Sequence, residues 1–195
     1  MKTIILIGGV AVAATLAGIA TPAAAADFTG PRIEAHAGWD RLRAESAPLK
    51  VDDRRDGIVY GVAAGYDVAL GDKAVAGLEV GFDLSDVDFA SVAGTTKSEV
   101  AVKRDISVSA RIGARVADNV LVYAKGGYSN ARLEGVITTG ATRTEVAANG
   151  DGVRVGGGIE LALGPNAYAK AEYRYTDYEG GVTRHQALTG LGFRF

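Results

Sequence analysis

From residue 31 onward, the dominant pattern in the chain is an alternation of apolar and polar side chains with a period of two residues. This period places successive side chains on opposite faces of a β-strand, whereas a helix would repeat every 3.6 residues. In the clearest case, Ile106 and Val108 share one face of a segment while Asp105 and Arg111 share the other. Eight segments follow this pattern: 32–40, 58–70, 74–84, 105–116, 120–129, 152–163, 167–177 and 186–195. Their lengths are near the roughly ten residues that a tilted strand needs to cross a bilayer.

The connections between these segments alternate between short and long. Three tight turns rich in Gly, Asp, Asn and Pro are expected at 71–73, 117–119 and 164–166. Longer polar stretches are expected at 43–56, 85–104 and 132–151, with a shorter one at 179–184. Strict alternation puts all short connections at one end of the sheet, as in membrane barrels with short periplasmic turns and longer surface loops. The sequence therefore predicts an all-β fold, an eight-stranded antiparallel up-and-down transmembrane β-barrel with four surface loops.

The N-terminal segment is expected to be a cleaved secretory signal peptide covering residues 1–26. It has a basic start at Lys2, an apolar centre and a small-residue end, with Ala24 and Ala26 marking the cleavage site. An uncleaved membrane anchor is the alternative, because the apolar run approaches the length of a spanning helix. Pro22 and the alanine tract favour cleavage. The barrel domain would then cover residues 27–195.

Alternation alone does not tell whether the apolar face points outward, as in a membrane barrel, or inward, as in a soluble lipocalin-like barrel. The polar face interleaves glycine with long charged side chains, an arrangement that suits the narrow interior of an eight-stranded barrel. Its charges balance, as a buried lumen requires. The positive set is Arg32, Arg111, Arg115, Lys125, Arg154, Lys170, Arg174 and Arg194, and the negative set is Glu34, Asp40, Asp67, Glu79, Asp83, Asp105, Glu160 and Glu172.

Aromatic residues favour the same orientation. Most of them lie on the apolar face and many are near strand ends, where Trp and Tyr collect at membrane interfaces. In a soluble barrel the same residues would be core residues. The expected aromatic girdle consists of Trp39, Tyr60, Tyr66, Phe82, Tyr128, Tyr173, Tyr175 and Phe193.

Composition and motifs exclude several other classes. The absence of cysteine removes disulfide scaffolds, thiolate metal sites and cysteine nucleophiles, and a net charge of −2 gives no support for nucleic-acid binding. Phosphate-loop, dinucleotide, zinc-protease and calcium-loop motifs are missing, so we expect no cofactor, metal or catalytic site. An enzyme on a barrel scaffold would have to use His36, on the polar face of the first strand, or His185, before the last one. We expect one lumenal and one loop histidine instead.

Taken in order, these features resemble the small outer-membrane β-barrel family of Gram-negative bacteria, which includes opacity-type surface proteins and OmpA-like porins. The tract 27–31 leading into a Trp-containing strand, the tract 122–128 and the terminal strand ending at Phe195 carry the resemblance. The resemblance implies that Leu191, Phe193 and Phe195 form the signal read by the barrel-assembly machinery. Unlike full-length OmpA-type proteins, this chain is expected to have no peptidoglycan-binding domain after the last strand.

The expected function is that of a non-enzymatic outer-membrane protein with a structural, surface-antigen or adhesion role. Its partners would be outer-membrane lipid, the assembly machinery and a host or surface ligand at the loops. The charged first loop, 41–56, is read either as a contact for anionic lipid or a host partner, or as a solvated loop. In the second loop, Val87, Phe89, Val92, Val100 and Val102 either extend strands or form an adhesive patch. The alternatives are a small-ion pore, which a charge-filled lumen disfavours, and a soluble periplasmic ligand-binding barrel.

Overall fold

The structure is a computed structural model that describes residues 27–46, 51–86, 88–93, 96–139 and 142–195. Within these ranges no helix is long and apolar enough to cross a membrane. The expected signal peptide, residues 1–26, lies outside the described residues. The strands are β1 (Gly30–Ser46), β2 (Val51–Leu70), β3 (Ala74–Ser85), β4 (Asp88–Ala93), β5 (Thr96–Ala117), β6 (Val120–Thr139), β7 (Thr142–Ala162), β8 (Ala167–Tyr178) and β9 (Val182–Arg194).

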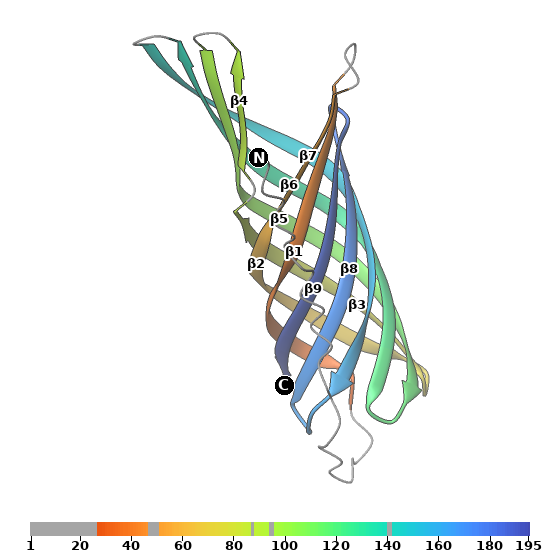
Figure 1. Cartoon of the computed structure of the whole chain (residues 1–195). Helices are drawn as coiled ribbons and strands as arrows, with labels where there is room; N and C mark the ends of the chain where they lie inside the picture. The colour runs from red at the N-terminus through yellow and green to blue at the C-terminus, as the bar shows by residue number, and fades with distance from the viewer. Residues whose placement is uncertain (1–26, 47–50, 87, 94–95, 140–141) are drawn as a thin grey trace, which may run out of the picture.

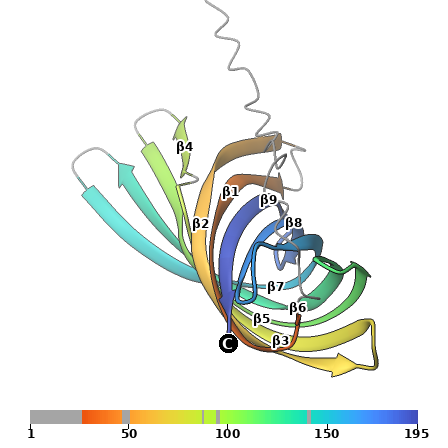
Figure 2. The same cartoon turned by 90° about the horizontal axis from the view of Figure 1, so that it is seen from below.

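The strands form one closed antiparallel barrel (Figures 1 and 2). Their order is β3-β2-β1-β9-β8-β7-β6-β5-β4, and an additional pairing of β3 with β5 closes the ring. β4 is an outward continuation of β3, because the two pair with successive stretches of β5. The ring therefore has eight strand positions, and the predicted eight-stranded up-and-down barrel is confirmed.

The predicted strand ends agree with the structure at the lower end of the barrel, whereas at the upper end the strands extend further than predicted. The three short connections at 71–73, 117–119 and 164–166 all lie at the lower end in Figure 1. Gly71 has φ +81° there, a left-handed conformation that glycine adopts without strain. At the upper end the expected long polar stretches are mostly strand, since β5 has 22 residues, β6 has 20 and β7 has 21. Polar hairpins can extend a barrel above the membrane, because their backbone hydrogen bonds need no apolar face.

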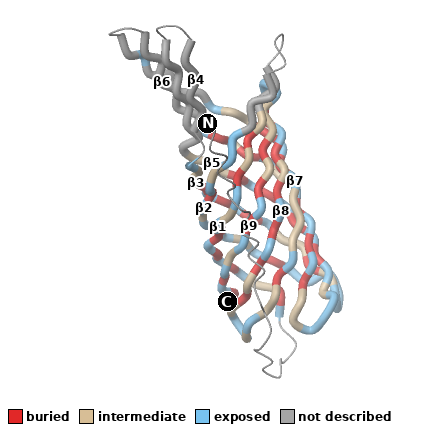
Figure 3. Tube along the Cα trace, viewed as in Figure 1, coloured by how far each residue is buried: buried red, intermediate tan, exposed pale blue. Residues whose placement is uncertain are grey.

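The barrel has its charges inside and its apolar side chains outside. Buried and exposed residues alternate along each strand of the barrel wall (Figure 3). Ile33, Ile58, Leu78 and Val153 are more than half exposed on the outer wall. A soluble barrel would bury these side chains, so the soluble ligand-binding alternative is wrong. Apolar packing inside is confined to small clusters such as that of Phe28, Val75 and Leu121 near the short turns.

Candidate functional site

The barrel interior contains a continuous network of ion pairs. At its lower end Asp67 lies between two arginines. Arg111 donates from Nε and Nη2 to the two Asp67 carboxylate oxygens at 2.8 and 2.6 Å, and Arg32 Nε donates to Oδ2 at 3.0 Å. Glu160 accepts from Arg111 on one oxygen and from Arg194 Nη2, at 2.7 Å, on the other. Five side chains from five strands are thereby tied together.

The middle of the interior is built around three glutamates and two lysines. Lys125 Nζ lies 2.6 Å from Glu79 Oε1 and 2.7 Å from Glu172 Oε1. Lys170 pairs with Glu34 and also approaches Glu172 Oε2 at 3.4 Å. Each carboxylate thus shares its charge with more than one cation, as a site that excludes water requires.

The upper part of the interior pairs two aspartates with two arginines and a histidine. Asp83 accepts from Arg174 Nη1 at 2.9 Å, and its other oxygen lies 2.6 Å from His36 Nε2. Arg154 pairs with Asp105 and donates from Nε to Thr176 Oγ1 at 2.9 Å. These contacts join β1, β3, β5, β7 and β8 across the lumen.

Fifteen of the sixteen charged residues expected on the inward face are buried in the barrel, and Arg115 is the exception. Arg115 is partly exposed at the short-turn end, where its Nη2 donates to the backbone oxygen of Asp72 at 2.9 Å. Arg115 pairs with the buried Leu121 and so belongs to the inward face, but it lies at the end of β5, where the barrel interior opens and the side chain is not enclosed.

Arg184 is an interior cation that the sequence prediction did not include. It was assigned to the loop 179–184, but β9 begins at Val182 and Arg184 is buried, bonded to Asp40 and Asp105. Its signal was available, because the even positions of β9 all point inward and Arg184 continues that series. With Arg184 added to the expected set, the described residues place eight cationic and eight anionic side chains in the interior.

Three interior phenols were also missed. Tyr123 donates to Glu172 Oε2 at 2.5 Å, Tyr168 to Glu34 Oε2 at 2.9 Å and Tyr178 to Asp105 Oδ2 at 2.7 Å. Each phenol lies on the polar side of its strand alternation. A buried Tyr requires a hydrogen-bond partner, and these carboxylates have capacity left for one.

The eight residues expected in the aromatic girdle all lie on the outer face of the barrel. Seven of them are exposed, and Tyr175 is partly covered by His185, with ring centroids 5.0 Å apart. The three residues expected to form the assembly signal are exposed on the outer face at the end of β9. Leu191, Phe193 and Phe195 therefore present one continuous apolar edge near the chain terminus.

The two histidines lie on opposite sides of the barrel wall. His36 is buried in the lumen, as expected, whereas His185 belongs to β9 and not to a loop, and lies on the outer wall. In the register of β1 with β9, His36 pairs with Gly190 and His185 with Arg41, so the two rings do not share a site. Among the described residues, no group of three or more His, Asp or Glu side chains could hold a metal ion.

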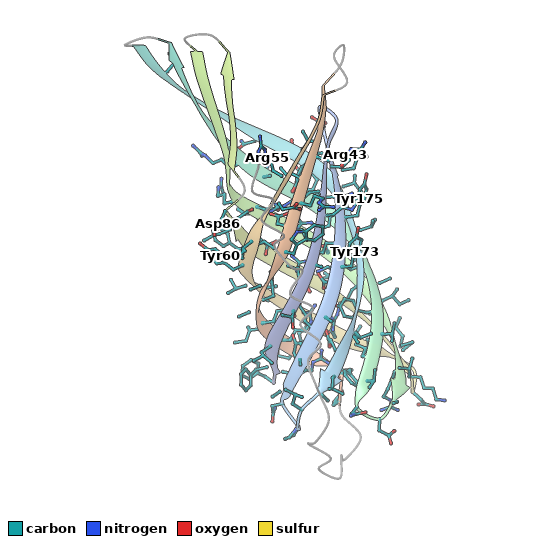
Figure 4. The ribbon with its side chains drawn as sticks, viewed as in Figure 1. Arg43, Arg55, Tyr60, Asp86, Tyr173 and Tyr175 are labelled. Atoms are coloured by element: carbon teal, nitrogen blue, oxygen red, sulfur yellow. The ribbon has the colours of Figure 1, made fainter. Side chains whose placement is uncertain are left out.

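Above the apolar band, the outer wall carries a rim of polar and aromatic side chains. Arg41 donates from Nε to Asp56 Oδ1 at 2.7 Å, and its guanidinium lies 4.6 Å from the centre of the Trp39 ring. This hydrogen bond holds the pKa of Asp56 below its ordinary value. Tyr173 Oη lies 2.6 Å from His185 Nδ1. In Figure 4, Arg43, Tyr175 and Tyr173 follow one another down this side of the barrel.

The expectations for the first and second upper loops, 41–56 and 85–104, fall partly outside the described residues. Residues 47–50 and 87 are not described, and no side chains are described for Phe89, Val92, Val100 and Val102. The backbones of those four belong to β4 and β5, in agreement with the interpretation that they extend strands.

The barrel is a closed ring of eight strand positions with charged side chains inside and apolar side chains outside. These features define a small transmembrane β-barrel of a bacterial outer membrane. The chain belongs to the family described as outer membrane protein beta-barrel domain, whose model matches residues 10–195.

Known relatives agree with this assignment. The chain is 27% identical over 209 residues to the 31 kDa outer-membrane immunogenic proteins of Brucella melitensis and Brucella suis, covering 90% of this chain and 87% of each relative. Its fold is similar to that of Neisserial surface protein A, with a TM-score of 0.55, 19% identity, and coverage of 86% of this chain and 98% of the other. It is also similar to Ail, the attachment invasion locus protein of Yersinia pestis, with a TM-score of 0.54, 15% identity, and coverage of 85% and 99%.

Proposed function

We propose that this outer-membrane protein is a non-enzymatic scaffold that displays its upper hairpins as a surface antigen or adhesin. The observation that carries the proposal is the contrast between the two ends of the barrel. The lower end closes in tight turns, while β5, β6 and β7 continue upward well past the residues of the apolar band. A rigid barrel that fixes the feet of long hairpins suits recognition, because the hairpins can vary without disturbing the wall.

The interior supports this role more than it supports transport. The alternative function, a small-ion pore, would need an open path, but eight cationic and eight anionic side chains occupy the lumen. An eight-stranded barrel leaves room for little more than its side chains. In planar lipid bilayers, we therefore expect no steady openings; reproducible openings that pass sugars would contradict the closed-scaffold proposal.

Two relatives support the surface role. The Brucella relatives are named as immunogenic proteins of the outer membrane, and Ail is named for attachment and invasion and has been crystallised with a heparin analogue. By analogy, the upper hairpins would meet a host or surface ligand. The proposal includes a signal peptide over residues 1–26, export, and insertion by the barrel-assembly machinery through the edge formed by Leu191, Phe193 and Phe195. The outward aromatic residues would then form the interfacial girdle.

Epitope accessibility tests the display part of the proposal. A tag placed between Thr139 and Thr142, at the end of the β6–β7 hairpin, should bind antibody on intact cells. A matched tag between Asp118 and Asn119, in a short turn, should bind only after the outer membrane is permeabilised. The reverse result would overturn the proposed orientation.

Hairpin shortening tests the adhesion part. Removing residues 134–147 leaves Leu133 and Ala148, which pair with each other, at the end of a shorter β6–β7 hairpin. We expect the shortened protein to insert normally, shown by the gel-mobility difference between boiled and unboiled samples, while cell attachment falls. Unchanged attachment after equivalent shortening of each upper hairpin would contradict an adhesive role.

A further inference from the structure

The outer wall has a hollow of about 240 Å³ at the level where its apolar band ends. We call it the rim pocket. Its described lining residues are Trp39, Arg41, Arg43, Tyr173 and His185. These five contribute two guanidinium groups, an imidazole, a phenol and an indole, with no carboxylate among them. Nothing in the interior network or in the proposed display of hairpins uses this pocket.

The register of three neighbouring strands explains the hollow. One row across the wall runs Trp39, Ala187, Tyr173, so that a methyl group separates two large rings. The next row up runs Arg41, His185, Tyr175. The small Ala187 therefore lies between the two rings, and Arg41 and His185 lie one row above them.

Two of the polar groups at the upper edge, those of Arg41 and His185, are held in position by neighbouring side chains. The Asp56 carboxylate accepts hydrogen bonds from Nε and Nη2 of Arg41, at 2.7 and 3.2 Å. These bonds hold the guanidinium above the Trp39 ring, and Nη1 is not part of the pair. Tyr173 engages Nδ1 of His185, so Nε2 is the remaining polar atom of that ring. Arg43 lies one step higher on the same face of β1 and lines the same hollow.

Directly below the pocket lies one row of small side chains. The row under Ala187 consists of Ala37, Thr189 and Ala171, all exposed and all small. Taller side chains lie on both sides of this lane, because Ala37 pairs with Tyr60 on β2 and Ala171 pairs with Ile159 on β7. A short apolar lane therefore lies directly below the cationic pocket and ends at the exposed Leu191 of the next row, which pairs with Ala35 and Ala169.

We propose that the rim pocket binds the phosphate-bearing headgroup of an outer-leaflet lipid, with an acyl chain lying along the lane below it. Guanidinium groups are the preferred partners of phosphate oxygens, and aromatic rings at an interface pack against the upper parts of lipids. Carboxylates border the site, since Asp56 pairs with Arg41 and Asp177 lies on β8 across from Thr183, but neither is among the described lining residues. The inference depends on the outer-membrane location and not on adhesion.

The protein provides its own probe, because Trp39 is its single tryptophan. The full barrel in an uncharged detergent is titrated with lipid A, a phosphorylated glycolipid, while Trp39 emission is recorded and native mass spectrometry counts bound lipids. We expect a saturable change in emission and one preferred lipid. Dephosphorylated lipid A should bind about tenfold more weakly, the factor of one charge-assisted hydrogen bond at a wet surface.

Three variants separate a built site from general surface charge. Arg43→Gln removes a cation, Ala187→Leu adds bulk between the two rings without altering charge, and Arg132→Gln removes an exposed cation from β6, elsewhere on the wall. The first two should weaken binding about tenfold and the third by less than about twofold. The proposal would be overturned if Arg132→Gln weakened binding as much as the pocket variants did. It would also be overturned if dephosphorylated lipid A bound as tightly as lipid A, or if both pocket variants kept full affinity. Gel mobility of unboiled samples verifies folding, and if Ala187→Leu does not fold, Arg43→Gln decides the result.

Discussion

Arg184 on β9 donates two hydrogen bonds to Asp40 on β1, from Nε to Oδ1 at 2.8 Å and from Nη2 to Oδ2 at 2.5 Å. The two residues are 144 positions apart and meet where the first and last strands of the barrel pair. Arg184 also donates from Nη1 to Asp105 Oδ2 at 2.8 Å, on the opposite wall. One guanidinium therefore fixes the closing seam and ties it to β5.

Replacing Arg184 with alanine should strongly destabilise the barrel. The change leaves Asp40 buried without its cation, which costs about 3–5 kcal/mol in comparable buried pairs. Urea unfolding in lipid vesicles, followed by gel mobility, measures the free energy of unfolding. Arg41→Gln is the matched control, because it breaks an exposed pair and should cost less than about 1 kcal/mol. Similar losses for both variants would contradict a buried seam contact.

Arg111 should not tolerate lysine. Its guanidinium binds both oxygens of Asp67 and also reaches Glu160, a three-contact geometry that a single ammonium group cannot reproduce. We expect Arg111→Lys to lower the free energy of unfolding by about 1–3 kcal/mol although the net charge is unchanged. A stability equal to that of the original protein would show that only charge matters at this position.

Glycine at position 65 makes room for the Arg32 guanidinium. A Cβ there would lie 2.8 Å from Nη2 and 2.9 Å from Cζ of Arg32, and 2.7 Å from the backbone oxygen of Leu78. Gly65→Ala should therefore displace Arg32 and cost about 1–3 kcal/mol in unfolding experiments. Gly126→Ala is the control on the outer face, where the nearest atom would be 4.0 Å away, and it should be nearly neutral. Equal effects would contradict the role of glycine as interior padding.

The alternation of apolar and polar residues predicted which side chains face into and out of the barrel wall. A period of two assigns each side chain to one face regardless of where the strand ends, so Arg32, Glu79 and Arg174 could be placed inside from sequence alone. Charge balance, together with the glycine and aromatic patterns, then favoured this face as the inward one, because buried charges need partners of opposite sign. The identity of each partner did not follow, since partners such as Arg184 and Asp40 depend on strand stagger and closure.

The upper strand boundaries were harder to predict for a physical reason. Above the membrane both faces of a hairpin meet water, so apolar alternation disappears while backbone pairing continues. Arg184 was assigned to a loop on this ground although it lies in β9. Tyr173 and His185 show the same limit, because their contact and the hollow beside it arise from the register of β8 against β9.

Acid should release the Arg41–Asp56 pair at the rim only at low pH. Hydrogen bonding to Arg41 lowers the pKa of Asp56 from its ordinary 3.8, so the pair contributes its stability above that value and loses it as the pH falls through the lower pKa of the folded state. Carboxyl carbon NMR should show Asp56 still ionised at pH 4. In Arg41→Gln the pKa should rise toward the ordinary value, and an unchanged titration would contradict the pairing.

Phe195 should matter more for assembly than for the finished barrel. Its backbone nitrogen donates to the Pro31 oxygen at 2.9 Å, but its ring is 72% exposed on the outer face. Phe195→Ser keeps that backbone bond, so the unfolding free energy should fall by no more than about 1–2 kcal/mol. If the edge of β9 is read by the assembly machinery, the amount inserted in cells should fall severalfold while refolding into vesicles proceeds normally. Phe82→Ser, another outward aromatic but on β3, is the control for lost lipid contact. An equal loss of insertion in both variants would show that lipid contact, and not recognition of the last strand, limits assembly.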